Sequence, residues 1–365
     1  MGTVDDDVGP ELAAWDVALR IGRGASRFST PLDAKTRRRL DTDFDEATAR
    51  AEELVEVATG LRSTAGPARG LVVDRAGWIE ANVGSLRRLL APAGRAFGEQ
   101  GARGRALLSP ATRTAAGVEF GVLLAWMSSR VLGQYDLMPL GGDDSGGFVY
   151  YVGPNVVALE RRHGFAPREF RLWIALHEVT HRMQFTGVPW MRKYFLGLIE
   201  RGTSLAVPDV RQLLESLRRA AAEVWEGRNP LAEGGIVGLI ASSDQLATLR
   251  EAQALMSLLE GHGEFVMSRA GADEVPDAAR FASVFAARRS SAKGVSKLVQ
   301  QALGLEAKLR QYSAGRNFVQ AVDSAGGAQL FARVWRSPGA LPTMEEISAP
   351  EKWIARVGGV AALSA

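Results

Sequence analysis

The chain of 365 residues contains no cysteine and only four histidines. The absence of cysteine excludes disulfide bonds, cysteine-based zinc sites, iron–sulfur clusters and thiol nucleophiles. Any soft-metal chemistry must therefore use histidine. A chain without a disulfide framework also fits a reducing compartment.

A long hydrophobic run is missing as well. The most apolar stretch, Phe120 to Met127, is far shorter than the ~20 residues that a membrane helix needs. The segment from Met1 to Asp7 is acidic, whereas a secretory signal peptide begins with basic residues followed by an apolar run. We therefore expect a cytoplasmic protein with no membrane partner.

The sequence has no strong excess of charge of either sign. Its formal net charge is only +3, so the pI near 9.3 reflects a small surplus on a nearly balanced chain. This surplus is too small to indicate a nucleic-acid partner. The oligomeric state cannot be read from the sequence.

The residues that are present have an ordinary globular composition, with 46% hydrophobic and 23% charged residues. We expect a mainly α fold of the α+β class, in which residues 15–357 form one domain between tails at 1–14 and 358–365. A capping box from Thr343 to Glu346 predicts a last short helix around Trp353. Helical periodicity predicts the other helices, at residues 11–23, 33–60, 78–97, 117–132, 168–185, 190–201, 208–226, 240–269, 277–289, 294–312 and 316–335.

We expect a small sheet as well, because the runs at residues 148–152 and 156–159 predict strands or a hairpin. A short apolar run at residues 70–73 precedes the helix at 78–97. The run at 148–152 precedes the helix at 168–185. It could line a cleft and pair with an extended substrate, or it could be an internal strand. Tyr150 and Tyr151 in this run could donate to an oxyanion, although tyrosines in strands mostly pack.

Two of the four histidines form the motif His177-Glu178-Val179-Thr180-His181. On a helix, residues four apart lie on the same face, so both imidazoles can reach one metal ion. Glu178 would then stand beside the open coordination position and take a proton from zinc-bound water. The alternative is a pair of buried histidines that bind no metal.

The context of the motif favours the metal site. Pro167 stands where a first helical turn begins, and Gly187 and Pro189 end the helical pattern. Trp173, Ile174, Leu176 and Val179 make this helix apolar nearly all round, as is typical of a buried active-site helix.

Zinc in a catalytic site needs a third protein ligand. A metzincin would have a histidine at position 187, where this chain has Gly187, so that class is excluded. The best candidate is Glu260, an acidic residue in a largely apolar helix, in the segment Leu258 to Val266, because a buried carboxylate needs a partner. The glycine after it would allow close approach to the first helix.

Two other residues in this segment compete with Glu260. Glu264 lies one turn further along and could instead accept a hydrogen bond from a ligand histidine. His262 should point well away from that face, either as a transition-state donor or as a core histidine. The segment resembles the Glu-Gly-aromatic-Ala stretch with which gluzincin aminopeptidases supply their third ligand.

Several phrases together resemble an actinobacterial family of zincin-like, zinc-dependent metallopeptidases, one branch of which is associated with biosynthesis of the deazaflavin coenzyme F420. The resemblance runs from about Trp15 to Val357. It implies one zincin-like domain with an intact His177/Glu178/His181 site. The phrases that carry it are residues 72–78, 129–136, 176–190, 256–262 and 309–312.

The leading functional hypothesis is a gluzincin-type metallopeptidase or amidohydrolase, with Zn²⁺ held by His177, His181 and Glu260 and with Glu178 as the general base. Its substrate would be a peptide or a small amide. A non-catalytic zinc scaffold is the second hypothesis, although such a site would need only the ligands and not Glu178. The third is a small-molecule hydrolase in cofactor metabolism.

Overall fold

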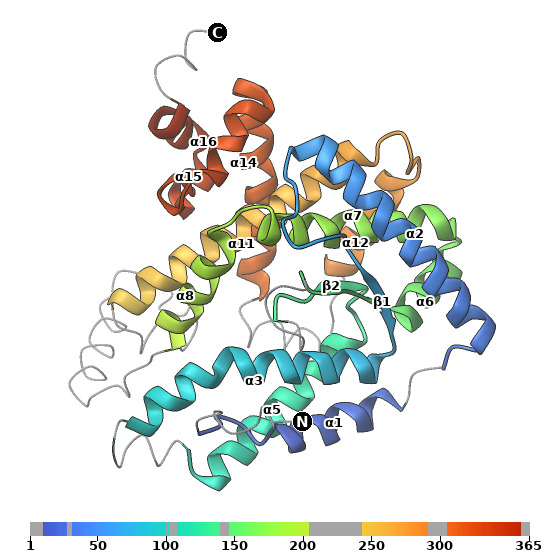
Figure 1. Ribbon diagram of the computed structural model, residues 1–365, viewed down its shortest axis with the longest axis vertical. Coiled ribbons are helices and arrows are strands. Elements are labelled where there is room, and N and C mark those ends of the chain that lie inside the picture. Colours follow the sequence, from blue (N-terminus) through green and yellow to red (C-terminus); the bar gives the residue numbers. More distant parts are fainter. Residues whose placement is uncertain are drawn as a thin grey trace. The chain divides into compact units, whose positions relative to one another are not determined.

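In the computed structural model, the residues that can be described are 10–27, 31–99, 101, 108–138, 146–203, 243–290 and 305–358. Most of them are helical (Figure 1). The larger helices are α1 (Trp15–Ser26), α2 (Ala34–Thr59), α3 (Arg75–Glu99), α5 (Pro110–Ser128), α6 (Gly153–His163), α7 (Pro167–Thr186), α8 (Met191–Thr203), α11 (Ser243–Ala270), α12 (Ala278–Ser290) and α14 (Leu305–Phe331). Short helices α15 (Met344–Ser348) and α16 (Pro350–Trp353) follow.

The chain divides into two compact units. The first comprises Met1–Leu196 and His262–Ala282, and the second comprises Gly197–Gly261 and Ser283–Ala365. Helix α11 is continuous across this division, since its residues up to Gly261 belong to the second unit and those from His262 to the first. The expectation of one domain over residues 15–357 remains a prediction.

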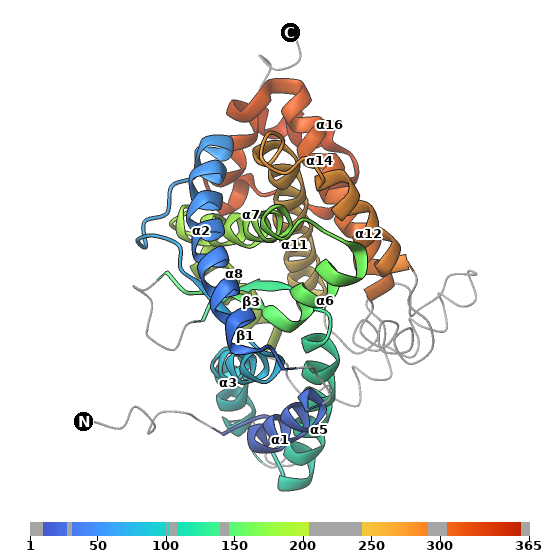
Figure 2. The ribbon, with the colours of Figure 1, turned by 90° about the vertical axis from the view of Figure 1, so that its right-hand side faces the viewer.

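The first unit is built around a three-stranded sheet with the order β1-β3-β2. The central strand β3 (Val149–Val152) runs parallel to β1 (Gly70–Val73) and antiparallel to β2 (Gly133–Tyr135). Helices α2 and α7 cover one face of the sheet, and α1, α3 and α5 lie on the other (Figures 1 and 2). All four residues of β3 are buried, as expected for a central strand with helices on both faces.

The two tyrosines of β3 point to opposite faces, as neighbouring residues of a strand must. Tyr151 stacks on Phe44 of α2 with the ring centroids 3.9 Å apart. Tyr150 joins an apolar cluster with Trp15 of α1 and Trp78 of α3. The sheet is therefore anchored to both helical layers through one short strand.

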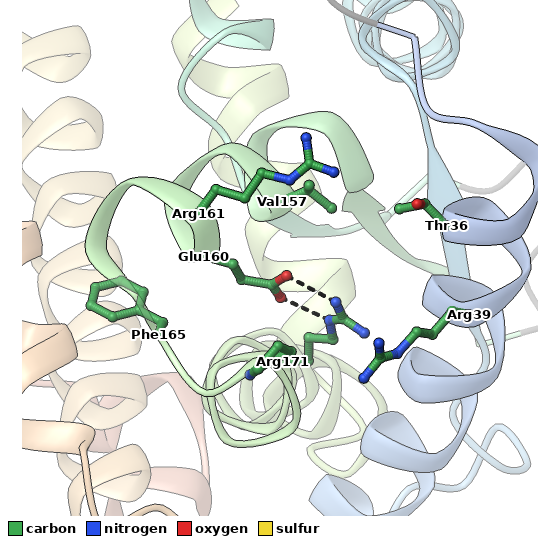
Figure 3. A pocket seen from close by; sticks show the side chains of 8 residues that line it. Thr36, Arg39, Val157, Glu160, Arg161, Phe165 and Arg171 are labelled. Atoms are coloured by element: carbon green, nitrogen blue, oxygen red, sulfur yellow. Dashed lines mark hydrogen bonds and ion pairs between the residues drawn. The ribbon is translucent and has the colours of Figure 1, made fainter.

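Buried ion pairs fix α7 to its neighbours. The Arg171 guanidinium donates to both oxygens of Glu160 on α6, at 2.8 and 2.9 Å, and also to Asp43 on α2 (Figure 3 shows the two bonds to Glu160). Near the other end of α7, Arg182 donates to Glu52 Oε1 at 2.7 Å and to the carbonyl oxygen of Gly66 at 2.6 Å. Because Arg171, Arg182 and their three carboxylate partners are mostly buried, these contacts hold α7 in one position against the sheet.

The predicted strand at 156–159 is wrong, since these residues lie in α6. Pro154 occupies the first turn of that helix, where its fixed φ and missing N–H are tolerated, and the β-branched run that follows is buried as a helix face. Strand β2 was not predicted. The helices expected at 294–312 and 316–335 overlap, within the described residues, with α14, which is kinked at Gly326 and Gly327. The helix expected at 208–226 lies outside the described residues.

In the second unit, α11 and α14 approach each other closely through glycines. A Cβ atom on Gly261 would lie 2.2 Å from the backbone carbon of Gly315, and one on Gly315 would lie 1.9 Å from the carbonyl oxygen of Ser257. The predicted capping box at Thr343 and the helix around Trp353 are confirmed. Among the described helices, none is both long and apolar enough to cross a bilayer.

Candidate metal centre

The two histidines of the motif lie one turn apart on α7, with their rings nearly perpendicular at 80°. Their Nε2 atoms are 3.2 Å apart. Two ligand atoms that bind a tetrahedral zinc ion at about 2.1 Å lie about 3.4 Å from each other. The helix therefore already places both Nε2 atoms at the separation that a shared zinc ion needs.

The opposite nitrogens of the two rings have partners of their own. His181 Nδ1 lies 3.0 Å from the amide oxygen of Gln184, and His177 Nδ1 lies 3.1 Å from the sulfur of Met267. Since an amide oxygen only accepts, Nδ1 of His181 donates to it, and in the tautomer that this requires the lone pair is on Nε2. Nε2 of His181 is therefore the ring nitrogen that faces His177 Nε2.

Glu260 joins the two histidines. Within the described residues, His177, His181 and Glu260 form a group whose potential ligand atoms all lie within 4.8 Å of one another. Helix α11 carries Glu260 without a break into residues that pack on α7 inside the first unit. Two imidazole nitrogens and one carboxylate oxygen are a donor set that suits catalytic zinc, so these residues fit the ion.

Gly263 is one point of close contact between α11 and α7. A Cβ atom there would lie 3.2 Å from His177 Nδ1 and 3.5 Å from His181 Cε1, so a side chain would press on both rings. The expectation that Gly261 serves this approach is wrong, because Gly261 faces Gly315 of α14 instead. Both glycines allow close helix contact, but with different helices.

His262 is not in the group of potential ligands. Its side chain is buried, and its Nδ1 accepts a hydrogen bond from the Gln184 amide nitrogen at 2.9 Å. Burial lowers the pKa of His262 to about 3, with a further contribution from the nearby His181. The Gln184 side chain of α7 reaches this ring, while the expectation that the ring points away from the Glu260 and Glu264 face of its own helix stays a prediction. His262 is a buried, hydrogen-bonded histidine. The role expected for Glu264 stays a prediction.

Glu178 is buried, as are Val179 and Thr180, whereas the two histidines of the motif are partly exposed. Strand β2 passes directly over it at Gly133, where a Cβ atom would lie 2.6 Å from Glu178 Cγ and 2.9 Å from its Oε1. An isolated glycine in a strand often marks a close approach of this kind. An isolated glycine in a strand was the one sequence signal that could have identified Gly133. It could be used only if residues 133–135 were first recognised as a strand.

The tyrosines of β3 are engaged elsewhere. The hydroxyl of Tyr151 lies 2.8 Å from that of Thr48, and the hydroxyl of Tyr150 lies 3.3 Å from Asp136 Oδ2. Burial raises the pKa of Tyr150 to about 12 and raises that of Tyr151 further still. Strand β3 is the internal strand of the sheet, so it does not present an edge to a substrate.

A cavity of about 290 Å³ lies between α2, α6 and α7 (Figure 3). It is lined by Thr36, Arg39, Val157, Glu160, Arg161, Phe165, Pro167 and Arg171. None of these residues is a predicted site residue, and the charged groups at its base, Glu160 and Arg171, are bonded to each other. We therefore place the functional site at the histidines and not in this cavity.

A family model of zincin-like metallopeptidases matches residues 14–354, which include every residue of the candidate centre. The chain belongs to this family. The description of this family implies zinc and supports a hydrolytic enzyme. The finer features of the sequence resemblance, the actinobacterial branch and its association with coenzyme F420, are not part of this match.

The chain is also similar in structure to a solved protein. A candidate hydrolase of novel fold from Chloroflexus aurantiacus has a crystal structure that superposes with a TM-score of 0.69 at 30% sequence identity. The similarity covers 95% of this chain and 99% of that one. Among curated proteins, none matches this chain significantly.

Proposed function

We propose that this protein is a zinc-dependent hydrolase of the gluzincin type that cleaves amide bonds in peptides. His177, His181 and Glu260 would hold the zinc ion. The observation that carries this proposal is the convergence of two imidazole nitrogens and one carboxylate within 4.8 Å, beside a buried carboxylate in the same motif.

Zinc bound at these residues would polarise the substrate carbonyl and make a water molecule acidic enough to lose its proton near neutral pH. Glu178 would accept that proton at its carboxylate and pass it to the leaving amine nitrogen. The strand above it supports this role, because Gly133 restricts where the carboxylate can lie. A scaffold that used zinc only to join helices would not require a confined carboxylate at this position.

Strand β2 favours an extended substrate. It contacts Glu178 through Gly133 and pairs with β3 on one side, and no second partner strand occurs among the residues that can be described. A sheet edge can bind a peptide in extended conformation through main-chain hydrogen bonds. The sequence resemblance to the branch associated with coenzyme F420 makes small amides the second substrate class to test.

The test combines metal content with hydrolysis. We expect the purified protein to cleave members of an internally quenched peptide library, to lose this activity with a chelator and to regain it with zinc. Glu178→Gln should keep the metal and abolish cleavage, since an amide cannot accept the proton. Full activity of Glu178→Gln would contradict the mechanism. Cleavage of small acyl amides but of no peptide would move the substrate to the second class.

A further inference from the structure

Gln184 lies in a chain of two hydrogen bonds that begins at a candidate metal ligand. Its amide oxygen is 3.0 Å from His181 Nδ1, and its amide nitrogen is 2.9 Å from His262 Nδ1. All three residues belong to the first unit, Gln184 and His181 on α7 and His262 on α11. A single side chain therefore connects the ligand to a buried histidine on another helix.

The chemistry of the amide fixes the direction of both bonds. Its oxygen can only accept and its nitrogen can only donate. His181 must therefore donate from Nδ1, and His262 must accept at Nδ1. If the amide were rotated by 180°, its NH₂ group would face the N–H of His181, and its oxygen would face the His262 lone pair. With both rings in the tautomers stated above, both contacts would then be repulsive.

The surroundings keep this arrangement in place. Gln184 is fully buried and His262 is 2% exposed, so water cannot replace either bond at little cost. In the tautomer that accepts at Nδ1, His262 thereby fixes which end of the amide faces His181. The amide in turn fixes the proton of His181 on Nδ1, the nitrogen that faces away from His177.

We propose that Gln184 is a positioning residue that keeps Nε2 of His181 unprotonated and directed at the metal, with His262 as the acceptor that orients the Gln184 amide. This inference rests on the zinc site proposed above. A histidine that ligates zinc commonly donates its other N–H to an oxygen acceptor, which fixes the ring and makes it a better ligand. Here that acceptor comes from the ligand helix itself, three residues further along.

The first test needs no metal and no activity. In metal-free protein labelled with ¹⁵N-histidine, at a pH well above the usual histidine pKa of about 6.5, two-bond ¹H–¹⁵N correlations report the tautomer of each ring. Only four histidines contribute signals. We expect the Nδ1–H tautomer for His181 and the Nε2–H tautomer for His262. The Nε2–H tautomer at His181 in the wild-type protein would overturn the proposal.

The second test measures zinc affinity by competition with a chromophoric chelator. Gln184→Leu should weaken binding by about 10–100-fold, the usual loss when such a partner is removed. Gln184→Glu should bind zinc at least as well as the wild type, because a carboxylate still accepts from His181 and His262 can switch tautomer to donate to it. Gln134→Leu is the matched control, since its amide bonds to Asn82 and not to a histidine.

The outcomes separate this inference from the proposed function. If the wild type bound no zinc, the proposed site would be wrong, while the tautomer measurement would still decide the role of Gln184. If the wild type bound zinc and Gln184→Leu bound it equally tightly, the positioning role alone would be wrong. A loss in Gln184→Glu as large as in Gln184→Leu would also overturn it, because accepting from His181 would then not be what matters.

Discussion

Gly133 of β2 lies directly against Glu178 of α7, so close that a Cβ atom on the glycine would be 2.6 Å from Glu178 Cγ and 2.9 Å from its Oε1. The two residues are 45 positions apart in sequence, and the sheet brings them together. The backbone of one strand thus forms a wall of the space that holds the proposed general base. A methyl group on that wall would occupy the place where the carboxylate now lies.

Gly133→Ala should therefore reduce hydrolysis while the protein keeps its zinc. The Glu178 side chain is flexible enough to move away from the new methyl group. The substitution should therefore displace the carboxylate more than it lowers the stability of the fold. A displacement of about 1 Å can lower kcat by about 100-fold. The measurement is kcat together with zinc content and thermal stability.

Gly24→Ala provides the matched control for this substitution. Gly24 lies in α1, has no heavy atom within 4 Å of the Cβ position and does not have a positive φ. Its replacement by alanine should leave activity unchanged and should slightly favour the helix. Equal activity of Gly133→Ala and Gly24→Ala would show that β2 does not confine Glu178.

The zinc content of the protein should depend on both histidines of the motif. Purified protein should contain one zinc ion per chain, and His177→Ala or His181→Ala should remove it, since a site left with one imidazole and one carboxylate holds zinc poorly. His163→Ala is the control, because this histidine stacks on Phe165 at the end of α6 and is not in the group of potential ligands. Elemental analysis of dialysed protein measures the zinc content per chain. One full equivalent of zinc in the double variant His177→Ala/His181→Ala would show that these histidines do not bind the metal.

Local sequence was sufficient for some features of this site and not for others. His177, Glu178 and His181 were predictable because the period of one helix places them together. Glu260 was predictable because a carboxylate in an apolar helix needs a partner, although the reason assigned to Gly261 was wrong. The roles of Gly133, Gln184 and Met267 depend on contacts between residues from 3 to 90 positions apart, and the longer of these appear only once the elements are packed.

The secondary structure shows the same limit. The capping box at Thr343 was predictable because it is a local exchange of hydrogen bonds. The run Val156 to Leu159 was predicted as a strand, since a short apolar, β-branched run does not distinguish a strand from a buried helix. In the structure, Pro154 stands in the first turn of α6, and the run forms part of the buried face of that helix. Packing therefore decided the element that local preference left ambiguous.

The stability of the first unit should depend strongly on Arg171. Its side chain is only 5% exposed and is bonded to Glu160 and Asp43, each 8% exposed. Arg171→Met removes the positive charge and leaves two buried carboxylates without it, which should cost about 3–5 kcal/mol in the free energy of unfolding. Denaturant unfolding at neutral pH measures this loss.

The control for Arg171→Met is Arg20→Met. Arg20 is paired with Asp16 on the surface of α1, where the two side chains are 73% and 74% exposed. Removing an exposed pair should cost less than about 1 kcal/mol. A loss for Arg171→Met as small as that for Arg20→Met would mean that the buried cluster does not hold α7 in place.

The third ligand gives the sharpest distinction between two neighbouring residues. Glu260 and Glu264 lie one turn apart on α11, and only Glu260 belongs, among the described residues, to the group with His177 and His181. Glu260→Ala should weaken zinc binding by orders of magnitude, because two imidazoles alone hold the ion poorly. Glu264→Ala should weaken it only about 10–100-fold, as the loss of a partner to a ligand does.

Both affinities are measured by chelator competition, with Glu260→Gln to separate the loss of charge from the loss of the ligand atom. If Glu264→Ala lost the metal while Glu260→Ala kept it, Glu264 would be the third ligand, and if His262→Ala alone removed it, the ligand would be His262.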